Sequence, residues 1–243
     1  MSKFKRVLFK LSGESLAPQE NEKGIGWERT QKVAESILDI KKKTGTEIAI
    51  VIGGGNMVRG RDRGVEVDYT TADHIGMLGT IMNGLALEEA FNRLGGHETA
   101  TLMTSIEVKP VAEPYFFKRA RDHLEDGKIV VLGGGTGKSG CTTDYSAAIH
   151  AIETNCEVIL KGSNVDGVYT SDPKKDPEAK RYMYLSYKTA IKENLEIMDG
   201  QAFALCLNRK IPILIFKAED LFNVLKGEKI GTLVGDVEDE FYE

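Results

Sequence analysis

The stretch Glu47–Asn56, EIAIVIGGGN, joins an apolar run directly to three glycines. A continuous apolar run of this length is typical of a strand that is buried on both faces of a parallel sheet. The arrangement recurs twice, because Phe4–Leu11 is followed by Ser12-Gly13 and Lys128–Leu132 by a glycine loop, Gly133–Gly137. These segments predict strands that end in small-residue loops at one edge of a sheet.

Helix-like segments separate the apolar runs. The spacing of apolar residues predicts helices at Trp27–Lys43, Thr71–Leu94, Pro114–Glu125, Asp144–Thr154, Gln201–Lys210 and Asp220–Lys226. Further strands are expected at Thr99–Met103, Glu157–Leu160, Ile211–Phe216 and Gly231–Val234. This alternation predicts an α/β fold, a three-layer αβα sandwich with a mainly parallel central sheet. The turn-rich stretch 170–200 is expected to form a small β-hairpin or lid.

The composition is that of an ordinary globular protein, with 243 residues, 41% of them hydrophobic and 28% charged. No run approaches the ~20 apolar residues that a membrane helix needs, and Met1–Lys10 lacks the apolar core of a signal peptide, so we expect a cytoplasmic protein. Without the five acidic residues that follow Val234, the chain has 32 basic and 32 acidic residues. This balance argues against a nucleic-acid partner. The acidic tail is expected to be solvated and partly disordered.

Neither a disulfide framework nor a metal site is expected. The three cysteines, Cys141, Cys156 and Cys206, form no C-x-x-C pair, and the four histidines show no H-E-x-x-H spacing. Two nucleotide-binding motifs are matched incompletely. Gly135–Gly140 fits G-x-G-x-x-G, but the next strand ends in Lys161 rather than an acidic residue. Leu132–Ser139 lacks the first glycine of a P-loop.

The glycine loops nevertheless suggest phosphate binding. In an open α/β sheet, ligands bind beyond the carboxyl ends of the strands, and glycine lets backbone N–H groups approach an anion. Tight strand-to-helix turns are the alternative reason for these glycines. Lys10 and Lys161 lie at two strand ends, where they suit a cleft that neutralises transferring phosphate oxygens. The alternative is that their stems pack while their ammonium groups reach solvent.

Two aspartates, Asp144 and Asp199, lie at predicted helix starts. A first-turn aspartate is commonly a helix cap or a partner of the helix dipole. Here both are also candidates for holding lysines and magnesium in place.

Several motifs together resemble those of the bacterial UMP kinases, which belong to the amino acid kinase family. They are Lys10–Leu16 (KLSGESL), Gly53–Gly60 (GGGNMVRG), Ala72–Leu78 (ADHIGML), Gly135–Gly137 with Thr142–Asp144, Val165–Pro173 (VDGVYTSDP) and Met198-Asp199. The matches span Lys10 to about Val234, nearly the whole chain. Their order and spacing make the combination highly specific.

The resemblance implies phosphoryl transfer from MgATP to UMP, with Mg²⁺ bound to ATP and no covalent enzyme intermediate. It also implies a homohexamer, GTP as an activator and UTP as an inhibitor. One domain, 1–243, is expected to contain an acceptor-binding part (about 1–150), an ATP-binding part (about 151–235) and the acidic tail (236–243).

Residue roles follow from the same resemblance. The catalytic group comprises Lys10, Asp144 and Asp199, to which we add Lys161 for its place at a strand end. The ATP side comprises Lys10, Leu11, Ser12, Gly13, Gly55, Arg59, Ser163, Tyr169 and Asp172. The UMP side comprises Gly54, Asp73, Thr136, Gly137, Lys138, Ser139, Gly140, Cys141, Thr142 and Thr143. Asp73 is expected to bind the UMP ribose, and Tyr169 to face adenine.

The sequence departs from the family pattern at Lys138–Cys141 (KSGC), where the family usually has Asn-Pro and two aromatic residues. The missing aromatics would help to shape the acceptor pocket. Two other functions therefore stay open: a kinase of the same fold with a different small acceptor, and a non-catalytic uridine-nucleotide sensor.

Overall fold

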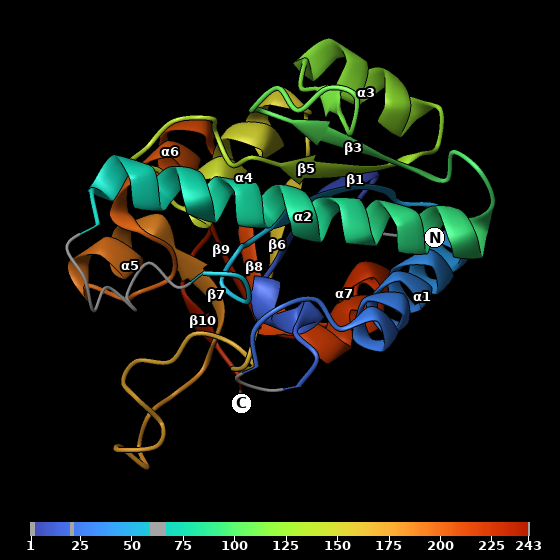
Figure 1. Cartoon of the computed structure of the whole chain (residues 1–243). Helices are drawn as coiled ribbons and strands as arrows, with labels where there is room; N and C mark the ends of the chain where they lie inside the picture. The colour runs from blue at the N-terminus through green and yellow to red at the C-terminus, as the bar shows by residue number, and fades with distance from the viewer. Residues whose placement is uncertain (1–2, 20–21, 59–66, 243) are drawn as a thin grey trace.

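A single ten-stranded sheet runs through the protein between two layers of helices (Figure 1). The computed structural model describes residues 3–19, 22–58 and 67–242. In chain order the strands are β1 (Arg6–Leu11), β2 (Glu47–Ile52), β3 (Ala100–Thr104), β4 (Glu113–Pro114), β5 (Ile129–Gly133), β6 (Val158–Ser163), β7 (Tyr182–Ser186), β8 (Ile213–Lys217), β9 (Thr232–Gly235) and β10 (Glu240–Phe241).

The helices are α1 (Trp27–Thr44), α2 (Tyr69–Gly95), α3 (Phe117–Glu125), α4 (Thr143–Glu153), α5 (Tyr187–Lys192), α6 (Gly200–Arg209) and α7 (Leu221–Lys226). Two short 3-10 helices, η1 (Gly13–Leu16) and η2 (Ala218–Asp220), complete the described elements.

The strand order is β10-β7-β9-β8-β6-β1-β2-β5-β3-β4. Neighbouring strands are parallel except in the pairs β8–β9 and β10–β7, so the predicted mainly parallel sheet is confirmed. β1 lies near the middle, between β2 and β6. The loops that follow these three strands therefore meet at one edge of the sheet.

Two apolar cores fill the spaces on either side of the sheet. Successive side chains of a strand point to opposite faces. In β1, Val7, Phe9 and Leu11 pack with α1, α2 and α7, whereas Leu8 packs with α3, α4, α5 and α6 on the other side. Figure 1 shows α2 and α1 covering the near face. The expected three-layer sandwich is confirmed.

The prediction of a helix beginning at Pro114 is wrong. Glu113 and Pro114 form β4, which pairs in parallel with β3 at the end of the sheet. Proline is tolerated at an edge strand because no further strand needs its missing N–H. The helix begins three residues later, at Phe117.

In the stretch 170–200, expected to form a hairpin or lid, the residues before β7 form an irregular excursion. Its two sides meet in one antiparallel bridge between Tyr169 and Arg181, and Thr170 N donates to Lys180 O. The excursion projects from the body in gold in Figure 1. The chain then enters β7 and α5, so the later part of 170–200 belongs to the packed domain.

The tail is solvated as predicted, since Asp236 and Glu238–Phe241 are exposed, but the expected partial disorder is wrong for the described residues up to 242. The tail adds β10 to β7, and the Phe241 ring stacks on Tyr182 with centroids 4.5 Å apart. Asp239 accepts hydrogen bonds from Ser186 N and from the Thr189 hydroxyl. Pairing to an exposed strand edge outweighs the acidic composition.

Within the described ranges, none of the helices combines the length and the apolar character needed to cross a membrane.

Candidate active site

Two lysines lie side by side at the carboxyl ends of the central strands. Lys10 of β1 and Lys161 of β6 are register partners on adjacent strands. Their Nζ atoms lie 3.1 and 2.9 Å from the two carboxylate oxygens of Asp144, in the first turn of α4. One carboxylate thus holds both cations, and the three side chains are only 15–19% exposed.

Burial by itself would raise the pKa of Asp144, because it disfavours the charged form. The positive charges of Lys10 and Lys161 outweigh that effect, so the pKa of Asp144 is lowered from its usual value. The carboxylate is therefore ionised at neutral pH. Lys161 Nζ also donates to the Ile197 carbonyl oxygen, which fixes it from a second side.

The loops after β1 and β2 pack against each other without space for side chains. A Cβ atom at Gly13 would lie 2.4 Å from the Gly53 carbonyl oxygen and 2.5 Å from Asn56 Oδ1. A Cβ at Gly54 would lie 2.7 Å from the Gly76 carbonyl oxygen of α2. Glycine is required at both positions by this close approach of the backbone.

A buried pair of asparagines fixes the second glycine loop. Asn83 Nδ2 donates to Asn56 Oδ1 at 2.7 Å and to Gly53 O at 2.8 Å. In return Asn56 Nδ2 donates to Asn83 Oδ1 at 3.0 Å and to Gly24 O at 2.7 Å. No role was predicted for Asn83 from the sequence. The feature that could have indicated one is a single amide side chain within the apolar stretch of the long predicted helix.

Asn83→Ala is expected to lower the free energy of unfolding by about 2–3 kcal/mol, because the buried groups of Asn56 and Gly53 lose their partners. Urea denaturation measures this change. Glu89→Ala, at an exposed position of the same helix, is the control and should leave stability within about 0.5 kcal/mol. Equal stability of both variants would contradict the role of the amide pair.

A cavity of about 500 Å³ lies between α2 and the loop that leads from β5 to α4. Six residues predicted for the UMP side line it: Gly54, Asp73, Lys138, Cys141, Thr142 and Thr143. The other four, Thr136, Gly137, Ser139 and Gly140, belong to the same loop but do not line this cavity. The Ser139 hydroxyl and the Gly140 backbone N–H instead donate hydrogen bonds to the carboxylate of Asp73.

A second cavity of about 620 Å³ lies on the other side of Asp144 and Lys161, next to α5 and α6. Asp199 lines it and caps α6, accepting hydrogen bonds from Gln201 N and Ala202 N at 3.0 Å. Its other carboxylate oxygen accepts from the Thr142 hydroxyl, whose oxygen also caps α4. Asp199 therefore joins the starts of two helices.

The remaining residues predicted for the ATP side are spread more widely. Ser12 and Gly13 lie just beyond Lys10 and Leu11, and Gly55 lines the first cavity. Ser163 ends β6, while Tyr169 and Asp172 lie on the excursion, where the Tyr169 hydroxyl donates to Asp166. Apart from Gly55, none of the described residues predicted for the ATP side lines either cavity, and this includes Lys10–Gly13. Arg59 lies outside the described residues.

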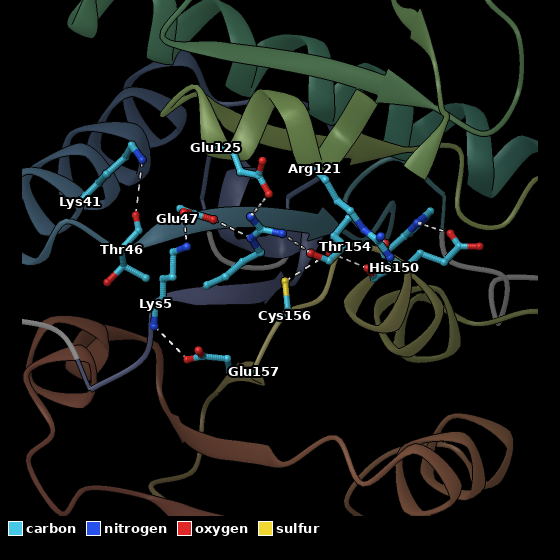
Figure 2. A network of polar contacts seen from close by, with 12 residues as sticks. Lys5, Lys41, Thr46, Glu47, Arg121, Glu125, His150, Thr154, Cys156 and Glu157 are labelled. Atoms are coloured by element: carbon cyan, nitrogen blue, oxygen red, sulfur yellow. Dashed lines mark hydrogen bonds and ion pairs between the residues drawn. The ribbon is translucent and has the colours of Figure 1, made fainter. Parts of the chain in front are cut away.

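A polar network occupies the opposite, amino-terminal end of the central strands (Figure 2). Arg6, at the start of β1, pairs with Glu47 and Glu125 and donates to Thr154 O. His150 of α4 is also buried, and its Nε2 lies 3.2 Å from the carbonyl oxygen of Gly135, in the loop that follows β5. Burial lowers the pKa of His150, so the neutral ring supports the loop as a hydrogen-bond donor.

The described residues contain no group of three or more His, Cys, Asp or Glu side chains placed to hold a metal ion. Asp144, the carboxylate nearest the two lysines, is already engaged by both.

Comparison with known proteins agrees with this fold and site. The amino acid kinase family model matches residues 5–217. A uridylate kinase of Deinococcus radiodurans is 45% identical over 235 residues, which cover 95% of each chain. The solved UMP kinase of Bacillus anthracis has a TM-score of 0.93 at 40% identity, with 99% of each chain covered. That of Ureaplasma parvum has a TM-score of 0.87 at 35% identity, covering 96% of this chain and 99% of that one. The chain therefore belongs to the amino acid kinase family, and within it to the uridylate kinases.

Proposed function

We propose that this protein transfers the γ-phosphoryl group of ATP, bound as MgATP, to the phosphate of UMP, giving ADP and UDP. The main support for this proposal is that residues in the first turn of α4 line both cavities. Thr143 and Ser146 line the cavity beside α2, and Asp144 lines the one beside α6. Two substrates bound in these cavities would meet at Lys10 and Lys161, which Asp144 holds between them.

In this reaction the protein positions the two substrates and stabilises the negative charge on the transferring phosphoryl group. The acceptor is a phosphate oxygen that is ionised at neutral pH, so transfer needs no strong general base. Lys10 and Lys161 would neutralise charge on the transferring oxygens, while Asp144 keeps their ammonium groups in place. Mg²⁺ enters with ATP and would neutralise charge on its phosphates.

The cavity beside α2 is proposed for UMP, because Asp73 and four residues of the loop Thr136–Thr143 line it: Lys138, Cys141, Thr142 and Thr143. The cavity beside α6 is proposed for ATP, because Asp144, Lys161 and Asp199 of the candidate catalytic group line it. Arg59, Ser163, Tyr169 and Asp172 are retained as ATP-side candidates, and Asp199 as a positioning residue for the start of α4. Gly55 lines the cavity proposed for UMP and is moved to that side.

The proposed division into an acceptor part (about 1–150) and an ATP part (about 151–235) follows the same pattern. The first cavity is lined by residues between Val51 and Ser146, and the second mainly by residues from Lys161 to Leu207.

Assembly into a hexamer is proposed from the exposed face of α2. Ile75, Leu78, Met82 and Leu85 are each 40–49% exposed and recur at helical spacing, which forms an apolar stripe suited to another copy of the chain. Sedimentation analysis measures the assembled mass directly.

Activation by GTP and inhibition by UTP are also retained as proposals, as is a cytoplasmic location. Turnover measured with GTP or UTP added tests each effect.

The deciding experiment is a coupled ADP-release assay with MgATP and a panel of acceptors: UMP, CMP, dUMP, AMP and GMP. We expect turnover to be fastest with UMP, despite the altered loop at Lys138–Cys141. Preference for another acceptor would support a different kinase of the same fold. Tight binding of uridine nucleotides without turnover would support a sensor.

A further inference from the structure

The loop from β5 to α4 is anchored at both of its ends. At its start, Gly135 O accepts hydrogen bonds from the Ser105 hydroxyl at 2.9 Å and lies within reach of His150. At its end, Thr142 caps α4 and donates to Asp199. Lys138–Cys141 lie between these anchors, and Lys138 and Cys141 line the acceptor cavity.

The middle of this loop is tied to α2 through one carboxylate oxygen. Asp73 Oδ2 accepts the Ser139 hydroxyl at 2.6 Å and the Gly140 backbone N–H at 2.8 Å. The hydroxyl contact has the length of a charge-assisted hydrogen bond. Asp73 lies on α2, and Gly76, Met77 and Thr80 of the same helix line the cavity. The contact therefore joins two opposite walls of one cavity.

We propose that Ser139, together with the Gly140 N–H, is a positioning residue that latches the loop onto Asp73 and thereby closes the acceptor cavity. The latch also fixes one oxygen of the Asp73 carboxylate, which sets the direction in which this group faces a bound acceptor. This second consequence rests on the proposed function, whereas the closure itself does not depend on which acceptor is used.

Three features of the site support a latch rather than an incidental contact. Two donors converge on the same oxygen, one from a side chain and one from the backbone. Lys138 and Cys141, which flank these donors, line the cavity. Gly140 has a φ of +80°, a left-handed conformation that glycine adopts without strain and that lets the loop turn here.

The test uses Ser139→Ala, with Ser139→Thr as the conservative variant that retains a hydroxyl. Hydrogen exchange of the segment 138–141, measured by mass spectrometry without substrates, reports opening of the latch. We expect Ser139→Ala to speed this exchange roughly three- to tenfold, and Ser139→Thr to restore slow exchange. Ser36→Ala, which removes an exposed hydroxyl from α1, is the matched control and should leave it unchanged.

Steady-state kinetics supply the second measurement. We expect Ser139→Ala to raise the KM for UMP roughly three- to tenfold, while the KM for ATP changes less than about twofold. A general loss of structure would change both constants, and a KM for UMP that the threonine variant does not restore would argue against the hydroxyl.

Exchange at the wild-type rate in Ser139→Ala would overturn the latch. If the wild-type protein does not phosphorylate UMP, the proposed function fails instead, and the exchange measurement still decides whether the loop is latched.

Discussion

Lys10→Ala lowers turnover by a factor of about 100 or more, while the free energy of unfolding changes by less than about 1 kcal/mol. Lys10 Nζ lies 3.1 Å from Asp144, which lines the cavity proposed for ATP, so its charge would be available to the transferring phosphoryl group. Removing it leaves Asp144 paired with Lys161 at 2.9 Å, so no buried carboxylate loses all its partners. Turnover of UMP at saturating MgATP and urea denaturation measure the two quantities.

Lys5→Ala is the matched control for this variant. Lys5 immediately precedes β1, but its side chain is 76% exposed and its ammonium group lies 3.8 Å from Glu47, at the other end of the sheet. We expect it to leave both turnover and stability nearly unchanged. Near-normal turnover in Lys10→Ala would remove Lys10 from the mechanism.

Asp144→Asn is expected to lower both activity and stability. Lys10 and Lys161 are register partners, and the negative charge of Asp144, which pairs with both, balances their mutual repulsion in this largely buried site. Its removal should lower the free energy of unfolding by about 3 kcal/mol at neutral pH and reduce turnover by a factor of about 100. Asp39→Asn is the control, because its pair with Lys43 is exposed and should contribute little.

The pH dependence of this effect has a defined sign. Burial raises the pKa of Asp144, but the positive charges of the two lysines lower it by more. The pKa in the folded protein therefore lies below the usual 3.8. Its contribution to stability is therefore present above pH 3.8 and is lost as pH falls through the folded pKa. The stability difference between wild type and Asp144→Asn should shrink below that pH. A difference independent of pH would contradict the ion-pair explanation.

The loop Lys138–Cys141 differs from the family pattern beside the proposed acceptor site. The family pattern supplies aromatic residues there, whereas this chain supplies a hydroxyl and a glycine N–H that bind Asp73. A small, polar loop tied to α2 can close the same cavity through hydrogen bonds instead of ring packing. We therefore expect selectivity for UMP to be kept, with loop closure more sensitive to Ser139 than to any loop side chain that faces solvent.

Local pattern was sufficient to predict most of the elements. The apolar run that precedes Gly53 forms the strand Glu47–Ile52, and the helix predicted at Trp27–Lys43 ends one residue later, at Thr44. Two local signals predicted these elements: an apolar run followed by glycine, and helical spacing of apolar residues that ends at glycine. Neither signal depends on contacts with distant parts of the chain. The helix predicted to begin at Pro114 was wrong because of a distant contact. Glu113 and Pro114 form β4 by pairing with the edge of β3.

The acidic tail shows the same limit. Its composition correctly predicts a solvated segment but also a partly disordered one, whereas the tail pairs with β7 and the Phe241 ring stacks on Tyr182. Neither partner can be recognised from the tail itself, because both lie more than fifty residues earlier in the chain.

By itself, the sequence determined the fold class, the edge of the sheet that carries the site, and the identities of Lys10, Asp144 and Lys161 as candidates. Each of these follows from residue type and local spacing. Only the tertiary structure decided that one carboxylate holds both lysines, that Asn83 fixes the second glycine loop, and that Ser139 binds Asp73. These contacts join residues from different elements, and their distances are set by strand register and helix packing, which no local pattern encodes.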